Sequence, residues 1–120
     1  MRSIHLYTVS VPAYGGYVYI LGDDHRNRLY IGITSNLIRR MWQHLHGNIP
    51  GYASRNRLCV LLYYDLFDRI EEAILREKQL KSWRREKKFA LIQEVNPTYQ
   101  DLITDPGDLE TLPQIKLLYE

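Results

Sequence analysis

The chain has 120 residues, which suits one domain with a single modest core. Hydrophobic residues at 45% and charged residues at 25% are typical of a folded globular protein and argue against wholesale disorder or a fibrous repeat. The one cysteine, Cys59, excludes an intramolecular disulfide, and its apolar neighbours predict a buried thiol. The longest uncharged apolar stretch, residues 58–64, is far shorter than the about 20 residues of a membrane-spanning helix, and residues 1–5 lead into no signal-peptide core. We therefore expect a cytoplasmic protein with no membrane partner.

The net charge is only +2, but the charges are unevenly distributed. Residues 25–90 contain 14 Arg or Lys against six Asp or Glu, whereas residues 91–120 contain one Lys against six acids. A basic middle is typical of a surface that faces a polyanion. A solvated helix face has the same composition, so charge alone does not choose between the two.

Two aromatic and β-branched segments, residues 17–21 and 29–33, flank a polar turn and predict an antiparallel hairpin. A third strand is expected over residues 58–64, where an almost continuous apolar run indicates a central position or one covered on both faces.

Three helices are expected around these strands. Ser35 or Asn36 can cap the first, which should end near Gly47 and carries apolar residues at every fourth position, namely Leu37, Met41 and Leu45. Asp68 and Glu71 resemble a capping box that opens the second, whose apolar face is Ile70, Ala73, Ile74 and Leu80. The third spans residues 84–95, points Phe89, Ile92 and Val95 inward, and ends at Asn96-Pro97 because the residue before proline avoids the helical region.

The predicted fold class is α/β of the α+β type, with a three-stranded antiparallel sheet flanked by helices in the order ββαβαα. We expect a folded domain over residues 16–102, an N-terminal extension over 1–15 and an acidic C-terminal extension over 103–120.

Three features of the sequence are not fully explained by the packing of such a fold. Glu77 is predicted on the apolar face of its own helix, where an unpaired carboxylate is costly, so it either pairs with an arginine or serves a site. Arg40 and His44 lie one helical turn apart beside the apolar stripe, as a snorkelling arginine and partly exposed histidine would, or as functional groups. Ten tyrosines against two phenylalanines indicate that some hydroxyls have a task.

The order of these residues resembles the GIY-YIG nuclease family, in particular its small stand-alone bacterial members. The resemblance covers residues 16–102 and rests on five elements: Tyr17-Val18-Tyr19, Tyr30-Ile31-Gly32, Arg40, Glu77 and Asn96-Pro97. Tyr17 stands where the family name has glycine, and Ile33 follows the second motif where the excision-repair incision subunit has lysine. Intron homing endonucleases contain related domains. The resemblance implies an endonuclease that hydrolyses DNA phosphodiester bonds with one divalent metal, in DNA repair or processing.

The resemblance also implies roles for six residues. The Tyr19 and Tyr30 hydroxyls would face the scissile phosphate, Arg40 would stabilise charge on its oxygens, and His44 lies where other members have histidine or tyrosine. Glu77 would bind the metal, and Asn96 would support the site.

The chemistry of the residues agrees with this assignment. Tyrosine or histidine can take a proton from water, and Arg40 supplies fixed positive charge. Because Glu77 is the one inward carboxylate that we identify, the sequence predicts one Mg²⁺ (or Mn²⁺), an ion that keeps waters and takes other ligands from phosphate.

Two other functions remain open from sequence alone. A non-catalytic nucleic-acid-binding module would keep the fold and use basic residues as phosphate contacts, namely Arg55, Arg57, Arg84, Arg85, Lys87 and Lys88. A helix-turn-helix reader over residues 70–95 is weaker, since no glycine turn precedes its second helix. With either a nuclease or a binding module, DNA is the expected partner, and a protein partner could supply specificity.

The pairing register of the first two strands is also predicted. Tyr19 and Tyr30 share one sheet face only if directly paired residues have numbers that add to an odd value, because a one-residue slip reverses every side chain.

Overall fold

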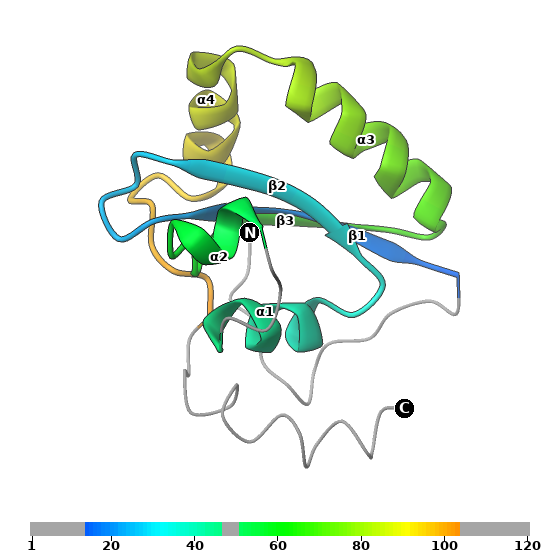
Figure 1. Cartoon of the computed structure of the whole chain (residues 1–120). Helices are drawn as coiled ribbons and strands as arrows, with labels where there is room; N and C mark the ends of the chain where they lie inside the picture. The colour runs from blue at the N-terminus through cyan, green and yellow to red at the C-terminus, as the bar shows by residue number, and fades with distance from the viewer. Residues whose placement is uncertain (1–13, 47–50, 104–120) are drawn as a thin grey trace.

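The computed structural model describes residues 14–46 and 51–103, where a three-stranded antiparallel sheet lies between two groups of helices (Figure 1). The strands are β1 (Gly16–Gly22), β2 (Leu29–Thr34) and β3 (Val60–Phe67). The helices are α1 (Leu37–Leu45), α2 (Tyr52–Arg55), α3 (Ile70–Ser82) and α4 (Arg85–Val95). The predicted α+β class and ββαβαα order are confirmed, with the one-turn helix α2 added before β3. The expected acidic extension, beyond its first residue, and most of the N-terminal extension lie outside the described residues.

The strand order is β2-β1-β3, and both pairings are antiparallel. Directly paired residues of β1 and β2 run from Tyr17 opposite Thr34 to Gly22 opposite Leu29, so their numbers always add to an odd value. The register prediction is therefore confirmed.

The first strand, not the third, occupies the centre of the sheet. All seven residues of β1 are buried, because helices cover both of its faces. The β3 strand lies at an edge but is covered on both faces: Leu61 packs with the α1 side and Leu62 with the α3 and α4 side. The apolar run of β3 thus reflects double coverage.

Two cores form on opposite faces of the sheet. Tyr17, Tyr19 and Leu21 of β1 pack against α1, and the alternating residues Val18 and Ile20 pack against α3 and α4. The period of two along β1 therefore assigns its tyrosines to the α1 face.

The buried face of α1 differs from the prediction. Leu37 and Met41 are buried as expected, but Leu45 is 43% exposed and His44 is only 4% exposed. Ile38 is also buried, and at about 100° per residue position 45 lies between positions 41 and 38 around the helix axis. The exposure of Leu45 therefore follows from its place as the last residue of α1 and not from its direction around the helix. The helix ends at Leu45 with His46 as its C-cap, and Asn36, one of the two predicted N-caps, accepts a hydrogen bond from the Arg39 N–H at 3.0 Å.

The capping box predicted for α3 is wrong. The N-cap is Arg69, which makes no capping side-chain bond, and the Glu71 carboxylate instead lies 3.7 Å from the Arg69 side chain at the surface. The α4 helix ends at Val95 as predicted, and Cys59 is half-buried rather than buried. In the described part of the chain, no helix has the length and apolar character to cross a membrane.

Candidate active site

The β1–β2 register brings two tyrosine rings together on the α1 face. Tyr19 is fully buried, and its ring centroid lies 6.3 Å from that of Tyr30. Tyr30 pairs with Leu21, two residues along β1 from Tyr19, so both side chains leave the sheet on the same side.

Gly32 makes room for this arrangement. It lies directly opposite Tyr19, whose ring passes over it. A Cβ at position 32 would lie 2.5 Å from the Tyr19 hydroxyl oxygen and 3.0 Å from the Tyr30 ring. Any side chain here would displace the Tyr19 ring, so the glycine of the second motif serves the tyrosine of the first.

His44 of α1 completes a cluster of three rings. Its Nε2 lies 3.1 Å from the Tyr19 hydroxyl oxygen, and its ring centroid lies 5.8 Å from Tyr19 and 5.7 Å from Tyr30. The other ring nitrogen, Nδ1, is buried without a hydrogen-bond partner among the described residues. The burial of His44 thus places an imidazole at the Tyr19 hydroxyl and beside the Tyr30 ring.

Burial sets the protonation of this cluster. Burial, and then the charge of Arg40, lowers the pKa of His44 to about 4, so the imidazole is neutral at pH 7. Burial, followed by the neighbouring Tyr30, raises the pKa of Tyr19, which the charge and hydrogen bond of Arg40 partly oppose. At neutral pH a protonated phenol therefore faces a neutral imidazole, with the Arg40 guanidinium beside both.

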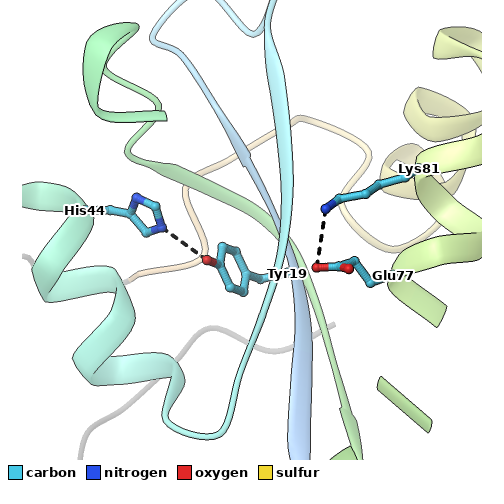
Figure 2. Close-up of polar contacts among 4 residues, drawn as sticks. All are labelled: Tyr19, His44, Glu77 and Lys81. Carbon is cyan, nitrogen blue, oxygen red and sulfur yellow. Dashed lines mark hydrogen bonds and ion pairs between the residues drawn. The ribbon is translucent and has the colours of Figure 1, made fainter. Parts of the chain in front are cut away.

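Glu77 approaches from the other face of the sheet. Figure 2 shows the Tyr19–His44 pair and the Glu77–Lys81 pair on opposite sides of the strands. The Glu77 side chain is 17% exposed, and its carboxylate lies 3.5 Å from the Lys81 Nζ, one helical turn further along α3. Its charge still reaches Tyr19, whose pKa it raises. The partner of Glu77 is thus a lysine that is 54% exposed, and not the buried arginine considered from sequence.

The donor set around Glu77 suits only one kind of metal ion. Within the described residues, no three His, Cys, Asp or Glu side chains gather in one place. A single carboxylate cannot hold an ion that needs a protein cage, but it fits Mg²⁺, which keeps several waters and takes ligands from phosphates. The residues present therefore fit a hydrated divalent ion held by Glu77 and a bound phosphodiester.

Asn96 lies away from the rings and connects two elements. It is 5% exposed, and its side-chain amide donates to the carbonyl oxygens of Leu62 at 3.1 Å and Gln100 at 2.8 Å. Its Oδ1 accepts from the Gln100 N–H at 3.1 Å. These bonds join the end of α4 to β3, so Asn96 acts on the scaffold and touches none of the candidate catalytic side chains.

Four of the six predicted DNA-contacting residues lie around the turn between β1 and β2. The Arg28 side chain donates to the Asn56 side chain, which lies between Arg55 and Arg57, at 2.9 Å. On the other side of the turn, the Arg85 guanidinium bonds the Asn27 carbonyl. Arg55, Arg57, Arg84 and Arg85 therefore come from separate segments to one end of the sheet, and Tyr30 lies one residue beyond the first residue of β2.

Two site features escaped the sequence analysis. Nothing in the sequence shows that Gly32 lies beneath Tyr19, because that contact depends on the register. The Glu77–Lys81 pair could have been found, since Glu four residues before Lys is the favoured orientation on a helix.

The chain is similar to the proteins of one known family. The family described as "GIY-YIG catalytic domain" matches residues 15–90. The chain is 36% identical over 78 residues to a UPF0213 protein of Staphylococcus haemolyticus, which covers 65% of this chain and 94% of that protein. A UPF0213 protein of Haloquadratum walsbyi is 35% identical over 78 residues, covering 65% of this chain and 86% of its own. No solved structure gives a significant match.

Proposed function

Because this chain belongs to the GIY-YIG catalytic domain family and has its nuclease fold, we propose that it is an endonuclease that hydrolyses DNA phosphodiester bonds. The observation that carries the proposal is the buried hydrogen bond between Tyr19 and His44, beside Arg40 and within electrostatic reach of Glu77. A core needs none of these polar groups in such a place, since phenylalanine and leucine would fill it without desolvating them.

The proposed roles follow the protonation states. Tyr19 donates its proton to the neutral Nε2 of His44 while its oxygen takes a proton from the attacking water. The imidazolium that forms is costly in this buried position, but a bound phosphate brings negative charge that raises the pKa of His44. The substrate thus makes His44 a better acceptor at the moment when a proton must move.

The remaining groups act on the charge and position of the phosphate. Arg40 stabilises the negative charge that develops on the phosphoryl oxygens, and Tyr30 orients the phosphate. A Mg²⁺ or Mn²⁺ held by Glu77, when bound, supplies further positive charge at the phosphate and the departing 3′ oxygen.

The alternative is a nucleic-acid-binding module without catalysis. The basic residues around the β1–β2 turn support it as well as they support a nuclease. Binding alone, however, requires neither the Tyr19–His44 bond nor an inward Glu77, so these groups favour the enzyme.

Cleavage of plasmid, single-stranded and branched DNA, with and without Mg²⁺ or Mn²⁺, tests the proposal. Tyr19→Phe should lower the cleavage rate by at least about a hundredfold, the size of a general acid–base contribution. Tyr17→Phe is the matched control, because Tyr17 is 3% exposed on the same face of β1 and does not bond His44. Equal rates for Tyr19→Phe and Tyr17→Phe would refute the role of Tyr19, and wild-type binding without cleavage of any substrate would favour the module.

Glu77→Gln tests the metal position. The substitution keeps size and polarity but removes the charge that holds a divalent cation, so cleavage should fall by orders of magnitude. Because Lys81 is 54% exposed, losing its partner should cost the fold less than about 1 kcal/mol. A stable Glu77→Gln protein that cuts at the wild-type rate would refute the assignment.

A further inference from the structure

A hollow of about 210 Å³ lies along β2, the edge strand nearest the site, and is lined by Leu29, Tyr30, Ile31, Lys81 and Lys88. Its two lysines come from different helices, α3 and α4, and none of the lining residues is acidic. An edge strand also presents unpaired backbone groups on its outer side. The hollow is therefore a place for an anion.

Two residues join this hollow to the candidate active site. Tyr30 lines the hollow and also belongs to the ring cluster with Tyr19 and His44. Lys81 lines the hollow and also pairs with Glu77, as Figure 2 shows. An anion in the hollow would consequently lie beside the groups proposed to act on the scissile phosphate.

The volume indicates what kind of anion fits. Pockets that enclose a whole small molecule are about 300–1,000 Å³, so this hollow suits one group of a longer ligand. We infer that it binds the backbone phosphate next to the scissile one, with Lys81 and Lys88 as its contacts. This inference rests on the proposed function, because that function supplies the strand whose phosphate enters.

Under this inference, Glu77 and the bound phosphate compete for Lys81. Its Nζ lies 3.5 Å from the Glu77 carboxylate, which is an ion pair too long for a good hydrogen bond, and more than half of its side chain is exposed. A phosphate in the hollow competes with Glu77 for Lys81, so removing the charge of Glu77, or neutralising it with a cation, strengthens the contact between Lys81 and the phosphate. Occupation of Glu77 and binding of the strand are thus coupled through Lys81.

A scan of single uncharged linkages tests the subsite. Oligonucleotides that each carry one methylphosphonate at a different position are bound in metal-free buffer and followed by fluorescence anisotropy. For the wild type, one position should weaken binding about fivefold more than its neighbours. Lys81→Ala and Lys88→Ala should each lose this position-specific effect, whereas the control Lys78→Ala, an exposed lysine on the same α3 helix, should keep it.

A second comparison tests the exchange of Lys81. Glu77→Gln should bind the unmodified oligonucleotide more tightly than the wild type without metal, and the gain should vanish in the Glu77→Gln/Lys81→Ala double variant. Glu86→Gln controls for the loss of one acid on a neighbouring helix. A gain that persists in the double variant would overturn the exchange.

The remaining outcomes separate a failure of the subsite from a failure of the proposed nuclease function. A flat methylphosphonate profile in the wild type, or one unchanged by both lysine variants, would overturn the subsite even if Mg²⁺-dependent cleavage is normal. If inorganic phosphate shifts the NMR signals of Lys81 and Lys88 while the profile is flat, the hollow takes free phosphate and the strand assignment is wrong. A lysine-dependent profile without cleavage would refute the nuclease and keep the hollow as a binding subsite for a strand phosphate.

Discussion

Burial keeps the His44 imidazole neutral, and this has a consequence for stability. The pKa of His44 is about 4 in the folded protein against about 6.5 in an unfolded chain, so the unfolded state binds more protons between these values. Stability should be fully present above pH 6.5 and should fall by up to about 3 kcal/mol as the pH drops to 4. Urea unfolding at several pH values measures this slope.

The matched variants for this prediction are His44→Gln and His46→Gln. The first removes the buried ring and should remove this contribution to the slope between pH 6.5 and 4. The second replaces the exposed ring of the C-cap residue, two positions further along the chain, and should leave the slope in place. Equal slopes for wild type and His44→Gln would mean that His44 is not held neutral by burial.

At the scale of elements, the β1–β2 hairpin positions Tyr19, the proposed catalytic tyrosine, through Gly32. Gly32→Ala places a Cβ 2.5 Å from the Tyr19 hydroxyl oxygen, so the ring must move off His44. A shift of about 1 Å in a reacting group can cost on the order of a hundredfold in rate. Cleavage should therefore fall by that order, and the loss should be much smaller in a Tyr19→Phe background, where the hydroxyl has already gone. Additive losses in the double variant would contradict the positioning role.

The junction between α4 and β3 depends on Asn96. Asn96→Ala leaves the Leu62 and Gln100 carbonyls without its amide and should lower the free energy of unfolding by about 2–3 kcal/mol. Asn96→Asp should cost more, since a carboxylate would face both carbonyl oxygens. Because Asn96 touches no candidate catalytic side chain, the folded fraction of Asn96→Ala should cleave at nearly the wild-type rate. Thermal melting beside single-turnover cleavage separates the two effects, and a large rate loss without a lower melting temperature would make Asn96 part of the site.

The sequence was sufficient to predict most of the strands and helices, but it was insufficient to predict the contacts between them. The aromatic and β-branched strands of the hairpin, the N-cap at Ser35 or Asn36 and the stop at Asn96-Pro97 depend on local chemistry. These predictions agree with the structure, in which Asn36 is the cap. The capping box at Asp68 is wrong because the chain enters α3 one residue later, which local sequence does not fix. The burial of His44 and the exposure of Leu45 depend on how the last turn of α1 packs against the sheet, which tertiary contacts decide.

At the scale of the whole molecule, basic residues gather at one end of the sheet, beside the β1–β2 turn. Hydrogen bonds connect the β1–β2 turn to the segment with Arg55 and Arg57 on one side and to the segment with Arg84 and Arg85 on the other. Tyr30 lies close to this turn, near the start of β2. The other end of β1, at Gly16, contacts Ile70 just after Arg69. Arg57 and Arg69 are both exposed, and they belong to segments at opposite ends of β1.

This polarity predicts how salt affects DNA binding. Because Tyr30 lies next to the basic end, we expect a bound strand to contact that end with several phosphates. Affinity should therefore fall steeply with salt, by about 0.9 logarithmic units per phosphate contact for each tenfold rise in salt concentration. Arg57→Gln and Arg84→Gln should each weaken binding to every sequence alike and reduce the slope by about one contact, because phosphate contacts carry no base information. Arg69→Gln removes the same charge at the far end and should change neither quantity. Affinities measured from low to physiological salt test this prediction. An equal effect of Arg57→Gln and Arg69→Gln would mean that net charge alone attracts the DNA. The strand would then have no defined path to the Tyr19–His44 pair.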